Sequence, residues 1–430
     1  MTADSSPERP WPAVLAIGAA AELLFLINLA RPSTPVFDET HYVPAARMLM
    51  TLAEPANIEH PLIGKLLIAL GIELFGDNSF GWRFFSTLAA TAVVMGVFAI
   101  GWQLLGRVRP AAYAALFVVL NFTVFIQARI AMLDGFMAAF VIGAIAALLW
   151  AMRGAPRSVP ARLAVGGILL GLAMGTKWVA VPYFGFALMA ILLIRLRDAR
   201  LANRPLGAAL GATGQAHFAG IATLPAVLIV AVTGIGVYLL TFLPAFFYRF
   251  QPMTLATLLP FQLTIYVQQT QALPPHPYQS AWWTWPLDLR PIWYLYEPVD
   301  GAVRGILLIG NPAIMSGGLV AVLACLYGAV RDRSPQLLAV AALWIGSIAI
   351  WAIIPKKIGF FYYYYLSSIF LGLALAAAFD RFGKARLKYG METFALLSFA
   401  LFAYFYPIIS AAPLANDQAF LRWMWLSSWP

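Results

Sequence analysis

Residues 134–152 have the sequence DGFMAAFVIGAIAALLWAM and are followed by RGAPRSVPAR over residues 153–162. Apart from Asp134 the first stretch carries no charge. As a helix rising about 1.5 Å per residue, it is long enough to cross the roughly 30 Å of hydrocarbon in a bilayer. The arginines that follow are typical of a connection on the cytoplasmic side. This stretch therefore predicts a membrane-spanning helix that begins at the outer face and ends at the cytoplasm.

Similar apolar stretches recur along the whole chain. Of its 430 residues, 62% are hydrophobic and only 11% are charged, and the mean hydropathy is +0.81. A water-soluble protein has about 45–50% apolar and about 25% charged residues, so that class is excluded. Strands of a membrane barrel would alternate apolar and polar residues, whereas these runs are continuous. We predict eleven spanning helices, over residues 12–30, 83–105, 110–127, 134–152, 162–176, 179–194, 218–243, 305–330, 336–354, 358–379 and 391–410.

The predicted fold class is an all-α polytopic membrane protein with a single domain over residues 1–430. Lys and Arg cluster in every second connection, so the net charge of +10 reflects topology rather than a nucleic-acid partner. We expect a cytoplasmic amino terminus and an outer carboxyl terminus in a cell inner (plasma) membrane. Two long outer segments, residues 31–82 and 244–304, are expected to form amphipathic surface helices that cover an active site, in the first case over residues 39–52 and 61–75.

Two adjacent carboxylates, Asp38 and Glu39, open the first outer segment. A carboxylate there can take a proton from an attacking hydroxyl, so Asp38 is the candidate general base and Glu39 its candidate catalytic partner. Alternatively, Asp38 caps the helix that follows. His60 and Lys65 are cation-capable candidates for substrate or sugar binding. No cysteine and histidine cluster typical of zinc is present in the sequence, but Asp38 and Glu39 could hold a divalent cation such as Mg²⁺ or Mn²⁺.

Two short outer connections contribute further charges. Arg129 and Asp134 stand at the ends of neighbouring predicted helices, where Arg129 could bind an anion or simply pair with Asp134. Asp134 is also a candidate substrate contact. Lys177 lies in an otherwise apolar turn with no acid near it in sequence, so a phosphate is its expected partner. The alternative is that the Lys177 ammonium extends to the membrane interface.

The second long outer segment and the connection before the tenth predicted helix are rich in aromatic residues. His276, Tyr278 and Arg290 lie among tryptophans that could anchor the chain at the interface or form a wall against a sugar. Lys356 and Lys357 precede a run of aromatic residues on the face where the charge bias disfavours lysine. Two lysines in that place favour binding of a lipid phosphate.

The order of these motifs resembles the protein O-mannosyltransferases, a family of polyprenyl-phosphate-dependent membrane glycosyltransferases. The resemblance covers residues 36–185 and 276–318, and beyond them the chain agrees only in hydropathy and in the number of helices. The motifs that carry it are Phe37-Asp38-Glu39-x-His41-Tyr42, His60-Pro61-Leu62-x-Gly64-Lys65, Arg129-x-x-x-Leu133-Asp134, Gly175-x-Lys177-Trp178, His276-x-Tyr278-x-Ser280 with Trp285-Pro286, and Gly310-Asn311-Pro312.

The resemblance implies the GT-C fold, a mannose donor on a polyprenyl phosphate, and transfer to Ser or Thr of a secreted or membrane protein on the outer face. It also implies that Asp38 and Glu39 are catalytic. By the same comparison, Arg129 and Lys177 bind the donor phosphate. Two features depart from the family: Leu62 stands where a second proline is usual, and the large loop domain of the eukaryotic members is missing. The second departure removes the evidence for a protein acceptor and points to a bacterial-type enzyme.

The residue chemistry by itself agrees with a transferase. A sugar on a lipid phosphate has a good leaving group, so an inverting in-line displacement needs one base for the acceptor and cations for the departing phosphate. A glycosidase would need two carboxyl groups flanking the bond, one of them protonated. Two alternatives stay open. One keeps the donor but uses a lipid, glycan or cell-envelope polymer as acceptor; the other is a lipid-linked-sugar flippase or transporter, which the nearly charge-free helix interiors disfavour.

Overall fold

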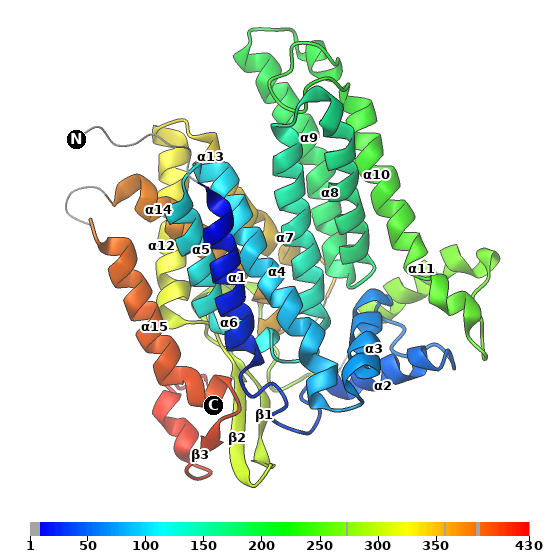
Figure 1. The fold of residues 1–430 in the computed structure, drawn as a ribbon, viewed down its shortest axis with the longest axis vertical. Coiled ribbons are helices and arrows are strands. Elements are labelled where there is room, and N and C mark those ends of the chain that lie inside the picture. The colour runs from blue at the N-terminus through cyan, green and yellow to red at the C-terminus, as the bar shows by residue number, and fades with distance from the viewer. Residues whose placement is uncertain (1–8, 272–273, 357, 384–387, 430) are drawn as a thin grey trace. The chain divides into compact units, whose positions relative to one another are not determined.

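A computed structural model describes residues 9–271, 274–356, 358–383 and 388–429, most of which are helical (Figure 1). Within these residues, nine helices are long and apolar enough to cross a membrane, and two more apolar helices are shorter. The shorter two are α1 (Pro10–Leu26) and α5 (Val108–Leu120). The nine spans contain α4 (Ser79–Leu105), α7 (Leu133–Met152), α8 (Val159–Met174), α9 (Val181–Leu201), α10 (Thr223–Leu240), α12 (Pro312–Arg331), α13 (Pro335–Ala349), α14 (Tyr365–Phe382) and α15 (Gly390–Ile409). Adjoining 3₁₀ turns lengthen five of them, so that α8, for example, belongs to a span over Pro156–Met174.

Each predicted span overlaps one of these helices, which confirms a polytopic helical membrane protein. Two predicted boundaries were wrong. The predicted helix over residues 110–127 is interrupted at Asn121, after which α6 (Phe122–Gln127) begins. The predicted start at residue 305 falls inside a strand, and α12 begins only at Pro312, where the Asn311 side chain accepts the N–H of Ala313. A short apolar run fits a buried strand as well as a helix, so hydropathy alone did not separate them.

A small sheet is the part of the described structure that the all-α prediction lacked. Strands β1 (Ile292–Val299), β2 (Ala302–Leu308) and β3 (Pro413–Leu414) pair antiparallel in the order β1-β2-β3. Asp300 and Gly301 connect β1 to β2 with φ angles of 52° and 75°. An Asp-Gly pair in this left-handed region makes the tight turn whose twist suits a hairpin.

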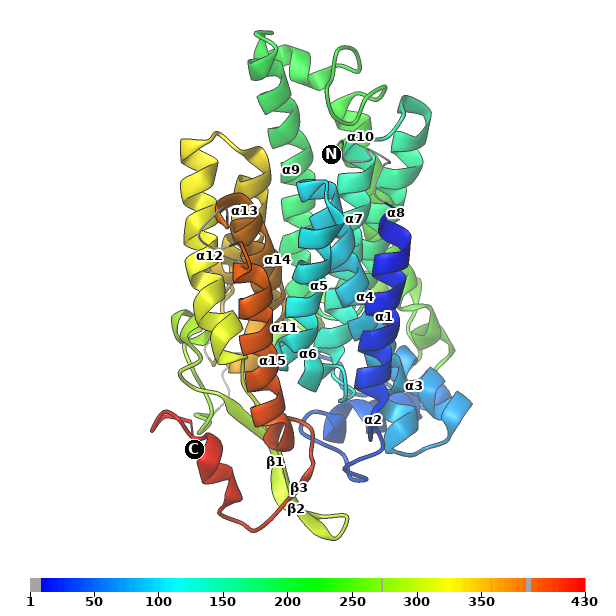
Figure 2. The same cartoon turned by 60° about the vertical axis from the view of Figure 1, so that its left-hand side comes forward.

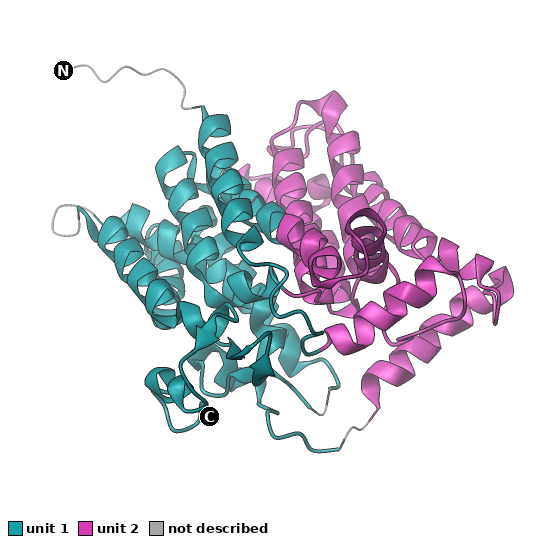
Figure 3. Cartoon of the chain, turned by 60° about the horizontal axis from the view of Figure 1, so that its bottom comes forward, with its two compact units in different colours: residues 1–37, 90–129, 272–430 teal, residues 38–89, 130–271 magenta. Residues whose placement is uncertain are grey.

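Contacts divide the chain into two compact units (Figure 3). Unit 1 comprises residues 1–37, 90–129 and 272–430, and unit 2 comprises residues 38–89 and 130–271. That the whole chain forms a single functional domain, as expected from the sequence, stays a prediction. In unit 1, α12 and α13 run as neighbouring helices and both pack on α14 (Figure 2). Every residue of α14 from Tyr365 to Ala377 is buried, so this helix forms the centre of the unit.

Unit 2 contains α7, α8, α9 and α10 together with the surface helices. Its close packing depends on small residues: a Cβ at Gly171 of α8 would lie 2.5 Å from the Gly234 carbonyl oxygen of α10. Only glycine lets two helices approach so closely. The helices predicted over residues 39–52 and 61–75 are confirmed as α2 (Glu39–Met50) and α3 (Ile63–Phe75), while their place on the membrane surface stays a prediction. Residues 244–304 hold α11 (Leu255–Thr270).

Candidate active site

Asp38 directly precedes α2 in unit 2, but its side chain makes no capping hydrogen bond to that helix. It accepts instead a 3.1 Å hydrogen bond from the Tyr42 hydroxyl, one helical turn further on. Burial raises the pKa of Asp38, while the charge of Lys177 and the Tyr42 hydrogen bond oppose the shift. The alternative of a simple helix cap therefore loses its support. The structure contains a half-buried carboxylate that accepts a hydrogen bond from Tyr42.

Glu39 points away from solvent into unit 2. Its two oxygens accept 2.8 Å hydrogen bonds from the Arg83 guanidinium, and one also accepts the Ala131 N–H at 2.8 Å. Neither side chain of this ion pair has any exposed surface. The pair fixes the start of α2 to α4. Arg83 was not among the residues predicted from the sequence, although a lone arginine at the start of an apolar run signals that a carboxylate partner is needed.

Lys177 and Asp134 form a second buried ion pair in unit 2, with 2.7 Å between the ammonium nitrogen and a carboxylate oxygen. Lys177 lies in the turn after α8, and Asp134 lies in the first turn of α7. No acid lies near Lys177 in the sequence, but the fold supplies Asp134 from 43 positions away. The phosphate partner expected for Lys177 stays a prediction. Asp134 thus has a structural partner in Lys177. The alternative pairing of Asp134 with Arg129 stays a prediction.

Arg129 belongs to unit 1, where it caps the end of α1. Its guanidinium donates to the carbonyl oxygens of Phe25 at 2.9 Å and Asn28 at 3.3 Å, and also to that of Ile27. The last carbonyls of a helix have no partner within the helix, so a guanidinium fork is well suited to satisfy them. The Arg129 side chain is buried, and it also covers the ring of Phe125.

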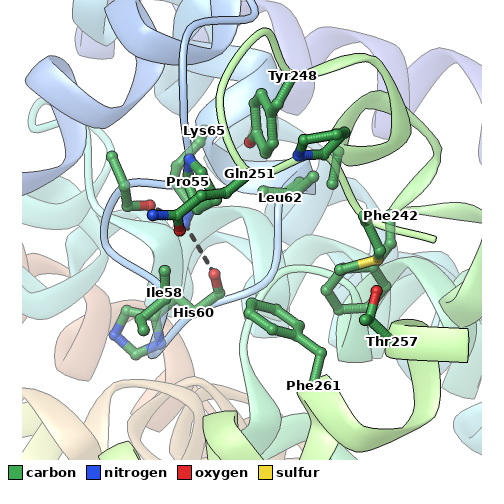
Figure 4. A pocket seen from close by; sticks show the side chains of 14 residues that line it. Pro55, Ile58, His60, Leu62, Lys65, Phe242, Tyr248, Gln251, Thr257 and Phe261 are labelled. Carbon is green, nitrogen blue, oxygen red and sulfur yellow. Dashed lines mark hydrogen bonds between the residues drawn. The ribbon is translucent and has the colours of Figure 1, made fainter.

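His60 and Lys65 lie on the wall of a pocket in unit 2 (Figure 4). The Lys65 ammonium donates to the carbonyl oxygens of Ala56, Asn57 and His60 at 3.1, 2.7 and 2.8 Å. Burial lowers the pKa of Lys65 to about 7, and the charge of Glu59 opposes the shift. The pocket, of about 260 Å³, is lined by Pro55, Ala56, Ile58, His60, Leu62, Lys65, Phe242, Ala245, Tyr248, Gln251, Pro252, Met253, Thr257 and Phe261.

The candidates at residues 276–290 lie in unit 1. Arg290 donates to the carbonyl oxygens of Pro277 at 2.9 Å and Ser428 at 3.1 Å, and its guanidinium lies 5.8 Å from the centre of the Tyr278 ring. The Tyr278 N–H donates to Nδ1 of His276. A hollow of about 330 Å³ beside them is lined by Tyr278, Trp293, Tyr296 and Phe420. The aromatic wall predicted for this segment therefore exists, with the Arg290 guanidinium bonded to the backbone.

The two lysines of the later connection stand apart from these groups. The Lys356 ammonium lies over the ring of Tyr363, 4.9 Å from its centre, which is a cation–π contact. Lys357 lies outside the described residues. Binding of a lipid phosphate by Lys356 and Lys357 stays a prediction.

The donor set does not fit a divalent cation shared by Asp38 and Glu39. Both Glu39 oxygens are engaged by the Arg83 guanidinium, which already neutralises their charge. Elsewhere in the part of the chain that the structure describes, no three His, Cys, Asp or Glu side chains gather at metal-binding distances. A cation at the predicted pair would require the buried ion pair to break.

Two family models match the chain. The model described as dolichyl-phosphate-mannose-protein mannosyltransferase matches residues 59–221, and the model of the C-terminal four-helix membrane region of protein-O-mannosyltransferase matches residues 254–429. The polyprenol-phosphate-mannose–protein mannosyltransferase of Mycolicibacterium smegmatis is 27% identical, over 97% of this chain and 93% of that protein. The Mycobacterium tuberculosis protein of the same name is also 27% identical, over 96% and 90%.

Solved structures show the same fold. The Saccharomyces cerevisiae protein O-mannosyltransferase Pmt1-Pmt2 complex, bound to its sugar donor, aligns with a TM-score of 0.81 over 99% of this chain and 93% of that chain, at 13% identity. ArnT from Cupriavidus metallidurans, bound to undecaprenyl phosphate, aligns with a TM-score of 0.59 over 92% and 64%, at 17% identity. The arrangement of helices is therefore that of the GT-C membrane glycosyltransferases.

Proposed function

This chain belongs to the protein O-mannosyltransferase family, and we propose that it transfers mannose from a polyprenyl phosphate to Ser or Thr hydroxyls of proteins, with Asp38 as the base. The observation that carries the proposal is the group of Asp38, Tyr42, Asp134 and Lys177 within unit 2. In this group a half-buried carboxylate lies in the electrostatic field of a buried ammonium, which suits proton removal beside a phosphate.

In the proposed reaction Asp38 takes the proton of the acceptor hydroxyl. The freed oxygen forms a bond to the anomeric carbon of mannose from the side opposite the phosphate. The bond between that carbon and the phosphate oxygen breaks, its electron pair leaves with the lipid phosphate, and the configuration inverts. The raised pKa of Asp38 suits this role, because a stronger base takes the proton more readily near neutral pH. The Tyr42 hydroxyl fixes which carboxylate oxygen is available.

Lys177 is the proposed contact for the donor phosphate. The leaving phosphate gains negative charge as the bond breaks, and an ammonium in a water-poor site stabilises that charge more than it would in water. Asp134 holds the ammonium in place through its 2.7 Å hydrogen bond. A lysine has three N–H donors, so one ammonium can bond a carboxylate and a phosphate oxygen at the same time.

The remaining candidates receive different roles. We propose that Glu39 acts as a positioning residue, since its pairing with Arg83 fixes the backbone next to Asp38. Arg129 is proposed to secure the end of α1 rather than to bind phosphate, because its observed contacts are carbonyl oxygens. The apolar pocket beside His60 is proposed to take part of the polyprenyl chain. His276, Tyr278 and Arg290 stay candidates for sugar contact, and Tyr278 lines the aromatic hollow.

The site is proposed to open at the outer face of a cell inner membrane, with the amino terminus in the cytoplasm. The clusters of Lys and Arg in alternate connections support this orientation. Reporter domains fused at each end test it: the amino-terminal fusion should be active only as a cytoplasmic reporter, and the carboxyl-terminal fusion only as an external one. The reverse pattern would contradict the orientation.

The decisive experiment for the function uses purified protein, polyprenyl-phosphate-mannose and a Ser/Thr-rich peptide. We expect release of polyprenyl phosphate and a mannosylated peptide of inverted configuration. A matched reaction replaces the peptide by a glycolipid, the acceptor class that the sequence left open as an alternative. Transfer to the glycolipid alone would replace the protein acceptor by a lipid one. Transfer to neither would refute the proposal.

A further inference from the structure

The ammonium of Lys65 is completely buried, although it stands next to an open pocket. Its three N–H donors meet three carbonyl oxygens, those of Ala56, Asn57 and His60, at 2.7 to 3.1 Å. In its ammonium form a lysine has three donors and no acceptor, so the hydrogen-bonding capacity of this form is filled by the backbone. The side chain could contact a phosphate or sugar only by giving up one of these bonds.

The carbonyl oxygens belong to the loop between α2 and α3, which forms no helix or strand over residues 53–62. Asn57 in this loop has a φ of 51°, in the left-handed region that non-glycine residues rarely adopt. Backbone oxygens of such a loop need partners when they are removed from water. Lys65 provides them from the first turn of α3, so one side chain holds the loop from inside.

A second tether reaches the same loop from α11. The Gln269 amide donates to the Glu59 carbonyl oxygen at 2.6 Å and to Nδ1 of His60 at 3.0 Å. Lys65 and Gln269 together therefore hold the carbonyl oxygens of residues 56, 57, 59 and 60. The bond at Nδ1 also fixes the plane of the imidazole and places the proton of a neutral ring on Nε2.

The Tyr42 side chain connects the His60 imidazole to Asp38, the proposed base. The His60 ring meets the Tyr42 ring edge to face, with 5.8 Å between centres. Tyr42 in turn donates its hydroxyl to Asp38. All of these residues belong to unit 2. A shift of the loop would thus move His60 and disturb the packing of the tyrosine that orients Asp38.

We propose that Lys65 is a positioning residue, which together with Gln269 clamps the loop of residues 56–60. The clamp fixes the position of His60 at the pocket proposed for the polyprenyl chain. This role rests on the proposed mannosyl transfer and differs from direct contact with the substrate, the role expected from the sequence. A residue that positions His60 affects turnover through His60, whereas a residue that contacts the substrate affects turnover independently of His60. The two roles therefore differ in how the effects of substitutions combine.

A double-mutant cycle tests this difference. Lys65→Met removes the ammonium at nearly constant length, and Gln269→Leu removes the second tether; each is made alone and with His60→Ala. Gln268→Leu, on the neighbouring glutamine of α11, is the matched control. For donor turnover we expect Lys65→Met or Gln269→Leu to lower kcat/KM about tenfold in the native background. In the His60→Ala background we expect a decrease of less than about threefold. Equal decreases in both backgrounds would overturn the proposal.

A second measurement does not depend on activity. Amide hydrogen exchange in residues 56–62 should become about tenfold faster in Lys65→Met and in Gln269→Leu, with exchange in α8 unchanged, and Gln268→Leu should match the native protein. Unchanged exchange in the loop would refute the clamp even in a protein that transfers mannose. If the native protein transfers no mannose at all, the proposed function fails while the exchange result still decides the clamp. If Lys65→Met does not fold, the Gln269→Leu cycle decides alone.

Discussion

The Lys177 ammonium and the Asp134 carboxylate lie 2.7 Å apart, and each side chain is only 5% exposed. The charge of Lys177 also acts on Asp38, where it opposes the pKa increase caused by burial. One lysine thus serves two carboxylates with different proposed roles: Asp134 holds it, and Asp38 reacts beside it. The predictions below separate these roles.

Asp38→Asn should reduce mannosyl transfer by about three orders of magnitude, because the amide cannot accept the proton of the acceptor hydroxyl. Binding of the donor should change by less than about threefold, since the proposed phosphate contact is Lys177. Single-turnover transfer and donor titration measure the two effects. Asp77→Asn, at an exposed carboxylate paired with Arg47, is the matched control and should stay fully active. A fully active Asp38→Asn enzyme would remove Asp38 as the base.

The pH dependence of kcat/KM should report the Asp38 carboxylate. The base must be deprotonated, so activity is lost as pH falls through its pKa. Burial raises this pKa, and the acid limb should therefore lie above the value of 3.8 of an exposed aspartate. Lys177→Met removes a charge that lowers the pKa and should move the limb to still higher pH. Lys177→Arg keeps the charge and should move it less. An acid limb at the same pH in Lys177→Met and in the native enzyme would contradict an effect of Lys177 on the pKa of Asp38.

Lys177→Met should weaken binding of the lipid-phosphate donor at least tenfold and should also destabilise the protein. Breaking a buried pair from one side leaves an uncompensated charge on Asp134, at a cost of about 3–5 kcal/mol. Adding Asp134→Asn removes that charge and should restore much of the thermal stability. Donor affinity should not recover in this double variant. Recovery of both would indicate that Lys177 has a structural role only.

The buried pair of Glu39 and Arg83 should behave as a unit. Glu39→Gln or Arg83→Met alone should lower the free energy of unfolding by about 3–5 kcal/mol, because either change strands a buried charge. The double variant should be more stable than either single one. Thermal unfolding in detergent measures this. If Glu39→Gln stays as stable as the native protein but loses transfer, Glu39 is itself catalytic and the positioning role is wrong.

Arg129→Ala should mainly affect stability. The guanidinium satisfies the carbonyl oxygens at the end of α1, and leaving them without a partner should cost about 1–3 kcal/mol. We expect donor affinity to stay within about twofold of the native value. A tenfold or larger loss of donor affinity, with thermal stability unchanged, would return Arg129 to the phosphate-binding role that the family resemblance implied.

Local properties of the chain were predictable because they depend on neighbouring residues alone. Continuous apolar runs located the spanning helices, and amphipathic spacing located α2 and α3. The strand β2 was missed because a short apolar run such as residues 305–309 fits a strand and a helix equally well. The strand formed because β1 offers it an antiparallel partner across a tight Asp-Gly turn, which is a non-local contribution.

The sequence by itself determined that this protein spans a membrane with many helices. It also singled out Asp38, Glu39, Asp134 and Lys177 as charged residues next to these helices, since a charge beside hydrocarbon is costly wherever it occurs. Only the tertiary structure decided their partners. Glu39 meets Arg83 across 44 positions and Lys177 meets Asp134 across 43, while Lys65 turns to the backbone of its own loop. A buried charge must be neutralised or hydrogen-bonded, but which group does so depends on which helices the fold brings together.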